Sequence, residues 1–310
     1  MINVLFSARP AAWDDYQGPL TDAFTTAGLD VALSRDHDPQ MVDYIVFSPN
    51  GPVTDFMPYT RCKAVLSLWA GVETVVGNET LTQPLVRMVD DGLTRGMVEW
   101  VVGHTLRHHL GVDAHIHGQD GIWRDTVYPP LASQRPVAIL GLGALGAACG
   151  NALTALGFPV TGWSRTAKNV DGIRCLHGDD GLQTALTGAQ VIILLLPDTP
   201  ATTHVLNPRT LARTANGAFV LNPGRGPLID DAALIAALDS GQIAHATLDA
   251  FATEPLPKNS PYWAHSQVTV TPHIASTTRP DTASNVIAST IQRSENGQPL
   301  INTVNRAAGY

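Results

Sequence analysis

Short runs of apolar residues alternate with helix-length amphipathic patterns along this chain. In the first hundred residues the pattern predicts a helix at 19–27 and strands at 3–6, 31–33, 44–47, 64–68 and 85–87. Short apolar runs bounded by turn residues are typical of buried strands, and strands that alternate with helices are typical of a parallel sheet covered on both faces. The first part of the chain therefore predicts an α/β domain.

The alternation resumes after a longer helix, expected at 97–110, and a polar stretch at 115–128. The next part of the chain predicts six strands, at 137–140, 160–163, 191–195, 218–221, 245–248 and 268–271, and a last helix at 279–293. Six strands with intervening helices are what a dinucleotide-binding sheet requires. We therefore expect an α/β fold of two Rossmann-like domains with parallel sheets and a cleft between them. The expected domains are a flavodoxin-like one, 1–97 with 278–310, and a dinucleotide-binding one, 98–277.

The balance of charge and the cysteines narrow the class of protein. Of the 310 residues, 44% are hydrophobic and 15% are charged, which is typical of a globular chain. The net charge of −8 disfavours nucleic acid or an anionic membrane as the main partner. Cys62, Cys149 and Cys175 form no CxxC pair, which disfavours a disulfide framework or a structural zinc site and favours the reducing cytoplasm.

Two stretches bear on targeting and membranes. The first seven residues lack a basic region followed by an apolar stretch, so we expect no signal peptide. Residues 136–164 carry no charge and are long enough for a membrane span. However, six glycines and Pro159 interrupt this stretch, which favours a buried strand, turn, helix and strand.

Three glycines in this stretch have the spacing of a dinucleotide-binding fingerprint. Gly141, Gly143 and Gly146 follow a predicted strand and open a predicted helix. The first glycine permits a tight turn, the second lets the backbone approach a pyrophosphate, and the third lets helix and strand pack closely. The helix N-terminus, with Ala144 and Leu145, supplies oriented N–H donors to the pyrophosphate.

The residues after the second strand of this domain favour NADP(H) over NAD(H). An NAD site normally places Asp or Glu about 20 residues after the fingerprint. The chain instead has Trp163, Ser164, Arg165 and Thr166, and no carboxylate before Asp171. Ser164, Arg165 and Thr166 can donate to a 2′-phosphate, and Arg165 can also stack on adenine. The alternative is a solvated basic loop without a ligand.

Three kinds of chemically active side chain follow later strands. Arg225, Asp249 with Glu254, and His273 each come just after a predicted strand, where open α/β sheets bind ligands. An arginine can hold a carboxylate through paired hydrogen bonds, and a histidine can donate a proton to a carbonyl oxygen. A nearby carboxylate favours the imidazolium form and orients the ring. This set of residues suits the reduction of a 2-oxo acid.

Together these segments resemble the D-2-hydroxyacid dehydrogenase family over nearly the whole chain. They are the glycine fingerprint, Asn-x-x-Arg-Gly at 222–226, Asp-x-Phe-x-x-Glu-Pro-Leu-Pro at 249–257 and Pro-His-x-Ala at 272–275. Within the family, 163–166, 260–263, 278–280 and 308–310 look most like the glyoxylate/hydroxypyruvate reductase branch. The resemblance implies NADPH-dependent reduction of a small 2-oxo acid, with the first domain binding substrate.

The resemblance also implies residue roles. His273 donates the proton, Glu254 supports its charged form, and Arg225 binds the substrate carboxylate and polarises the carbonyl. Asp249 holds the nicotinamide carboxamide. The substrate carboxylate also meets the backbone N–H groups of Ala70, Gly71 and Val72. Further cofactor contacts implied by the resemblance are Leu196, Pro197, Asn222, Pro223 and Ala275.

Several features leave alternatives open. The positions of Phe47, Trp69, Glu73 and 222–224 depart from the branch, which leaves a bulkier 2-oxo acid as an alternative substrate. A non-catalytic dinucleotide sensor is a second alternative, although a sensor needs no arginine, glutamate and histidine of this kind. An NAD-linked dehydrogenase is disfavoured by the residues at 164–165. For Trp263, packing and substrate contact both remain open, and for Arg279 the alternatives are substrate contact and a salt bridge at the start of a helix.

Five histidines lie in or after the helix at 97–110. His104 and His108 share a helical face at a spacing that suits a metal, but no glutamate of an HExxH motif lies between them, and we expect no metal. The others are His109, His115 and His117. This segment corresponds to the helix and arm by which the family dimerises, so the resemblance implies a homodimer.

Overall fold

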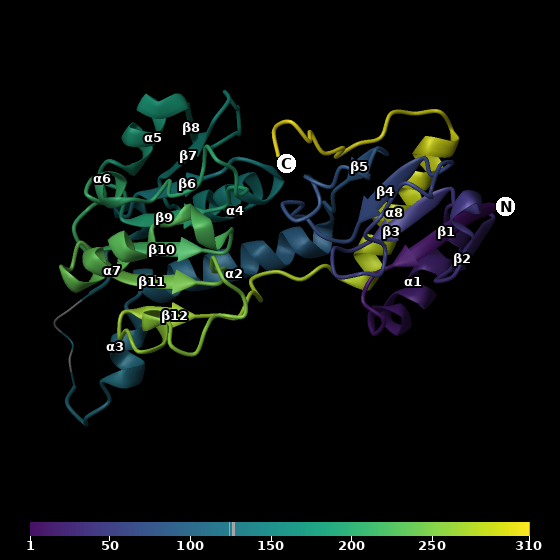
Figure 1. Ribbon diagram of the computed structural model, residues 1–310. Helices are drawn as coiled ribbons and strands as arrows, with labels where there is room; N and C mark the ends of the chain where they lie inside the picture. The colour runs from purple at the N-terminus through teal and green to yellow at the C-terminus, as the bar shows by residue number, and fades with distance from the viewer. Residues whose placement is uncertain (124, 126–127, 310) are drawn as a thin grey trace. The chain divides into compact units, whose positions relative to one another are not determined.

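The computed structural model describes residues 1–123, 125 and 128–309, and the chain divides into two compact units (Figure 1). Unit 1 comprises Met1–Leu93 and Thr277–Tyr310, and unit 2 comprises Thr94–Ser276. The boundary expected after residue 97 lies four residues beyond the observed one, which follows Leu93. The boundary expected before residue 278 lies one residue beyond the observed one, which precedes Thr277. Tyr310, in the last of the segments that carry the resemblance, lies outside the described residues.

Unit 1 is built on a five-stranded sheet with the order β2-β1-β3-β4-β5, in which all pairs are parallel. This order is that of flavodoxin-like folds. Its strands are β1 (Ile2–Ser7), β2 (Val31–Ser34), β3 (Tyr44–Phe47), β4 (Ala64–Ser67) and β5 (Leu85–Val86). Its helices are α1 (Ala12–Thr26), η1 (Pro39–Met41) and α8 (Pro280–Glu295), and α1 packs against α8 beside the sheet (Figure 1).

Unit 2 contains a seven-stranded parallel sheet with the order β12-β11-β10-β9-β6-β7-β8. In chain order this is the dinucleotide-binding arrangement 3-2-1-4-5-6 with one strand added. Its strands are β6 (Val137–Leu140), β7 (Val160–Ser164), β8 (Arg174–His177), β9 (Val191–Leu194), β10 (Ala218–Asn222), β11 (Ile243–Leu248) and β12 (Val268–Val270). Its helices are α3 (Val112–His117), η2 (Ala132–Gln134), α4 (Ala144–Ala155), α5 (Gly178–Leu186), α6 (Pro208–Leu211), η3 (Gly226–Leu228), α7 (Asp231–Asp239) and η4 (Pro261–Trp263), together with most of α2 (Asp91–His109).

Burial on both faces of each sheet explains the continuous apolar runs. Along β6, Ala138 and Leu140 pack with α5, α6 and α7, whereas Val137 and Ile139 pack with α2 and α4. Neighbouring side chains of a strand point to opposite faces, so a strand covered on both sides needs no polar alternation. The expectation of two α/β domains with parallel sheets is confirmed.

Several elements differ from the sequence prediction, and helix α2 begins at Asp91 rather than at residue 97. Helix α1 begins at Ala12 rather than at residue 19, and Pro19 lies inside it. Proline removes one helical hydrogen bond, and the buried side chains of Tyr16, Leu20 and Phe24 hold the helix on the core despite that loss. Strand β8 was not predicted because, at the edge of the sheet, Arg174–His177 has no buried residue and so no apolar run.

The uncharged stretch at 136–164 folds as strand β6, helix α4 and strand β7, as its glycines and proline predict. Within the described part of the chain, no helix combines the length and the apolar character needed to span a bilayer.

A buried histidine, His108, and a partly buried one, His245, lie where α2 packs on the second sheet. His108 Nε2 is 2.9 Å from Thr247 Oγ1, and its ring stacks on Phe219 with centroids 4.9 Å apart. His245 Nε2 is 2.9 Å from Thr269 Oγ1. Burial lowers the pKa of His108 to about 3 and that of His245 to about 4, so both side chains are neutral in the folded protein at pH 7.

These two histidines predict acid-sensitive stability. An unfolded histidine has a pKa of about 6.5, so the unfolded chain binds more protons than the folded one below that pH. The stability that the neutral pair contributes is complete above about pH 6.5 and is lost as the pH falls towards 4 and then 3. Between the folded and unfolded pKa values, the free energy of unfolding falls by about 1.4 kcal/mol per pH unit for each histidine. Urea unfolding of His108→Leu at pH 7.5 and 5.0 should show a smaller pH dependence than the wild type. The exposed His115→Gln variant is the control, and an equal slope in His108→Leu and the wild type would contradict the prediction.

Candidate active site

The three fingerprint glycines lie between β6 and α4, and two of them are required by packing. Gly141 has φ 113°, and a Cβ there would overlap the carbonyl oxygen of Leu195. A Cβ on Gly146 would overlap the carbonyl oxygen of Gly141. A Cβ on Gly143, in contrast, would meet no atom within 4 Å. The open space lies at the N-terminus of α4, where oriented N–H groups can bind a phosphate group.

Only some of the residues after β7 that were predicted to bind the cofactor are exposed to solvent. The Trp163 side chain is buried in the core and its Nε1 donates to the carbonyl oxygen of Gly178 at 2.8 Å. Ser164 Oγ donates to the carbonyl oxygen of Thr166 at 2.8 Å, so this hydroxyl shapes the turn. Arg165 and Thr166 are exposed. Of the side chains predicted to bind a 2′-phosphate, those of Arg165 and Thr166 are therefore the exposed ones.

The segment after β9 is held by its own hydrogen bonds. Thr202 Oγ1 donates to the carbonyl oxygen of Pro197 at 2.7 Å, and the side chain of Leu196 is buried. Because Leu195 lies against Gly141, this segment borders the fingerprint turn. That position is consistent with the predicted cofactor contact of Leu196 and Pro197, which stays a prediction.

Three adjacent parallel strands carry the predicted catalytic side chains. Strand β11 pairs with β10 on one side and with β12 on the other. Arg225 follows β10, Glu254 follows β11 and His273 follows β12, so all three come from the carboxyl edge of the sheet. A Cβ on Gly226 would overlap the backbone at Phe251, which means that the Arg225 segment packs directly against the segment leading to Glu254.

His273 and Glu254 form an ion pair if the ring is protonated. His273 Nδ1 is 2.8 Å from Glu254 Oε2, and Glu254 Oε1 accepts a hydrogen bond from Phe251 N at 2.9 Å. The His273 side chain is 48% exposed. Since Nδ1 is occupied by the carboxylate, Nε2 is the nitrogen left to act on a ligand. The structure thus brings the predicted acid and its predicted partner together.

Asn222 shapes the turn that carries Arg225. Its Nδ2 donates to the carbonyl oxygen of Arg225 at 2.9 Å, and its Oδ1 accepts from Gly224 N at 3.2 Å. The Arg225 guanidinium donates from Nη1 to the carbonyl oxygen of Gly224 at 2.8 Å. Asn222 and Pro223 are buried. In this structure the Asn222 side chain therefore stabilises the Arg225 turn through its two hydrogen bonds to the backbone.

The carboxylate of Asp249 bonds to the segment that carries His273. Its side chain is fully buried and accepts hydrogen bonds from the segment around His273. The donors are Thr271 Oγ1 and the backbone N–H groups of Ile274 and Ala275. Sequence reasoning missed Thr271, and only its position two residues before His273 could have pointed to it. The proposed contact of Asp249 with a nicotinamide carboxamide stays a prediction.

In unit 1, the turn at Ala70, Gly71 and Val72 follows β4. Val72 is buried in the core, and Ser67 Oγ accepts from Trp69 N at 3.0 Å, which fixes the start of the turn. Among the described residues, no acceptor takes the amide protons of 70–72.

The two residues with open roles lie at loop and helix ends. Trp263 is 53% exposed and its Nε1 donates to the carbonyl oxygen of Pro257 at 3.0 Å. Arg279, in unit 1, is the residue before helix α8.

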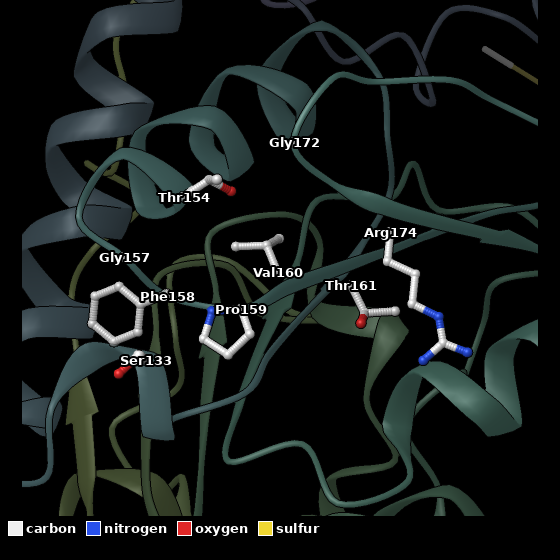
Figure 2. Close-up of a pocket in the computed structure, with 9 residues that line it drawn as sticks. All are labelled: Ser133, Thr154, Gly157, Phe158, Pro159, Val160, Thr161, Gly172 and Arg174. Carbon is white, nitrogen blue, oxygen red and sulfur yellow. The ribbon is translucent and has the colours of Figure 1, made fainter.

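A surface hollow of about 550 Å³ lies in unit 2 at the amino-terminal ends of β7 and β8, away from the carboxyl ends that carry the predicted site residues (Figure 2). Phe158 and Pro159 line it where β7 begins, and Arg174 lines it at the start of β8. None of the predicted site residues lines this hollow, because they follow the carboxyl ends of the strands.

The fold and this constellation together define a dinucleotide-dependent oxidoreductase. Residues 101–275 match the family model described as D-isomer specific 2-hydroxyacid dehydrogenase, NAD binding domain. This chain belongs to the D-isomer specific 2-hydroxyacid dehydrogenase family.

Relatives within the family share most of the chain. The glyoxylate/hydroxypyruvate reductase A of Yersinia enterocolitica is 36% identical over 285 residues, which cover 89% of this chain and 90% of the relative. The protein of the same name from Serratia proteamaculans is 39% identical over 258 residues, which cover 81% and 82%.

Two solved structures match the whole chain. A D-isomer specific 2-hydroxyacid dehydrogenase of Xanthobacter autotrophicus Py2, in complex with NADPH and MES, has a TM-score of 0.92 and 39% identity, covering 100% of this chain and 99% of its own. An NADPH-dependent glyoxylate/hydroxypyruvate reductase of Sinorhizobium meliloti, in complex with NADP and sulfate, has a TM-score of 0.86 and 31% identity, with 100% of each chain covered. The predicted family, fold class and oxidoreductase activity are confirmed.

Proposed function

We propose that this protein reduces a small 2-oxo acid, of the glyoxylate or hydroxypyruvate type, to the 2-hydroxy acid with NADPH. The observation that carries the proposal is the 2.8 Å contact between His273 and Glu254 beside the Arg225 segment. The names of the relatives at 36% and 39% identity support the same substrate class.

The residues of unit 2 divide the chemical work. NADPH, when bound, supplies the hydride. His273 donates the proton to the carbonyl oxygen from Nε2, and Glu254 holds Nδ1 and orients the ring. The guanidinium of Arg225 binds the carboxylate and stabilises the negative charge that develops on the oxygen. In unit 1, the N–H groups of 70–72 are further proposed donors to the carboxylate.

The same unit offers a cradle that fits the dinucleotide. The open space at Gly143 and the N-terminus of α4 suit the pyrophosphate. The exposed Arg165 and Thr166 suit a 2′-phosphate, which a carboxylate at this place would repel. The NADPH and NADP of the two related structures support the choice of cofactor.

Removing the arginine at this position should change cofactor preference. We expect Arg165→Ala to raise the KM for NADPH about tenfold or more, because a charge-assisted hydrogen bond contributes about 1.5–3 kcal/mol. The KM for NADH should change less than about twofold, since NADH has no 2′-phosphate. Steady-state kinetics with both cofactors measure the effect.

The matched control is Arg174→Ala, which removes an exposed arginine at the other end of the strands. Equal losses with NADPH and NADH in Arg165→Ala would show that Arg165 does not recognise the 2′-phosphate.

The test of the proposed function is NADPH oxidation over 2-oxo acids of increasing size, from glyoxylate and hydroxypyruvate to phenylpyruvate. The highest kcat/KM should belong to the acids of two or three carbons. A maximum at a large side chain favours the bulkier alternative instead. NADPH binding without oxidation for any acid favours a sensor.

We also propose a cytoplasmic homodimer. All three cysteines are free, which suits a reducing compartment. Large apolar side chains of 46–89% exposure gather in the segment after α2, which suits contact with a second copy. They are Leu110, Ile116, Ile122, Trp123, Tyr128 and Leu131. Light scattering on the purified protein should give twice the chain mass of 32.9 kDa, and a monomer mass would contradict the dimer.

A further inference from the structure

We propose that Asp249 is a positioning residue whose buried carboxylate fixes the turn that carries His273. The inference rests on the proposed role of His273 as proton donor. It assigns Asp249 a task inside the protein, beside the cofactor contact that the resemblance implies.

The carboxylate is occupied by three donors from one short segment. Asp249 Oδ1 accepts from Thr271 Oγ1 at 2.6 Å and from Ile274 N at 2.9 Å. Asp249 Oδ2 accepts from Ala275 N at 2.9 Å. The donors lie on both sides of His273 in the chain, so the two oxygens clamp the turn around it.

The backbone of Asp249 extends the clamp. Its carbonyl oxygen accepts from His273 N at 2.9 Å, and its own N–H donates to the carbonyl oxygen of Asn222 at 3.0 Å. Asn222 in turn shapes the Arg225 turn. One residue at the end of β11 therefore links the segments that carry the proton donor and the guanidinium.

The turn needs such a clamp because His273 has an unfavourable backbone conformation. Its φ is 54°, in the left-handed region that favours glycine. A residue other than glycine keeps such a conformation only when surrounding bonds over-determine it. The three carboxylate bonds and the bond to His273 N provide this constraint and hold the imidazole against Glu254.

Asp249 has no exposed surface, and both of its carboxylate oxygens are engaged within the protein, since Oδ1 accepts two hydrogen bonds and Oδ2 accepts one. The carboxylate therefore acts on the reaction through the turn of His273.

The test compares Asp249→Asn with wild type by three measurements on the full chain. Asparagine keeps the size of the side chain but turns an amide donor towards a backbone N–H of the turn. Without ligand, hydrogen exchange in a peptide covering 270–278 should become about tenfold faster or more. The kcat for glyoxylate should fall about tenfold or more, while the Kd for NADPH, from fluorescence quenching, should change less than about twofold.

Two further variants complete the test. Thr271→Val removes one of the three hydrogen bonds to the carboxylate. It should make exchange faster and kcat lower than in wild type, with smaller changes than in Asp249→Asn. This variant keeps the proposal testable if Asp249→Asn folds poorly. Asp231→Asn is the control, because Asp231 Oδ1 accepts from Tyr262 Oη at 2.8 Å on another part of the unit. It should leave exchange at 270–278 unchanged.

Two outcomes would overturn the proposal. Unchanged exchange in Asp249→Asn excludes the clamp, and a tenfold rise in the Kd for NADPH at the same time makes Asp249 a cofactor contact. Faster exchange with a normal kcat shows that the clamp does not serve the proton donor. If the wild type reduces no 2-oxo acid, the proposed function fails, whereas exchange and NADPH binding still report on the clamp.

Discussion

Replacing His273 by alanine is expected to lower kcat for 2-oxo acid reduction by about 10²–10⁴-fold, the usual contribution of a positioned general acid. The carbonyl oxygen of the substrate gains negative charge as hydride arrives. The variant lacks the imidazole that Glu254 holds, so it lacks the proposed proton donor to this oxygen. The Kd for NADPH should stay within about twofold of wild type, since the imidazole binds the carboxylate of Glu254 and none of the residues at the fingerprint. Pre-steady-state oxidation of NADPH and fluorescence titration measure the two quantities.

His204→Ala is a matched control for this variant. His204 is also exposed and has the same φ of 54°, so its replacement places an alanine in the same backbone conformation away from the proposed site. Its kcat should equal that of wild type. A His273→Ala enzyme that keeps more than about a fifth of the wild-type kcat would remove His273 from the reaction.

Replacing Arg225 by lysine is expected to lower kcat/KM for glyoxylate by about 10- to 100-fold. A guanidinium binds a carboxylate through two parallel hydrogen bonds, and lysine offers a single point charge on a differently shaped side chain. One lost charge-assisted bond corresponds to about 1.5–3 kcal/mol. Most of the loss should fall on the KM for the acid, and the Kd for NADPH should not change.

The exposed Arg213→Lys variant tests whether the exchange of arginine for lysine is itself harmful, and it should behave as wild type. An Arg225→Lys enzyme with an unchanged KM for glyoxylate would show that Arg225 does not hold the substrate carboxylate.

Much of the fold could be predicted because burial on both faces leaves a simple trace in the sequence. Strands such as β9 (Val191–Leu194) are buried throughout, so their residues form uninterrupted apolar runs. The edge strand β8 lacks this burial and was missed. The start of α1 was misplaced since proline usually begins a helix, and the packing that tolerates Pro19 is a tertiary property.

The pairing of His273 with Glu254 was also within reach of the sequence, since both follow neighbouring strands. What could not be predicted was the direction of individual side chains. Trp163 turns into the core, and Asp249 turns towards the His273 segment, because local packing and hydrogen bonding decide these orientations. The low pKa values of His108 and His245 likewise follow from burial between α2 and the sheet.

The most direct measurement is the transfer of deuterium from NADPH labelled at C4 of the nicotinamide to glyoxylate, followed by mass spectrometry of the product. The account predicts glycolate with one deuterium on C2 from the labelled position of one face, at a rate that His273→Ala lowers by about 10²-fold or more. Glycolate without deuterium from either labelled face, or an equal rate in His273→Ala and wild type, would contradict it.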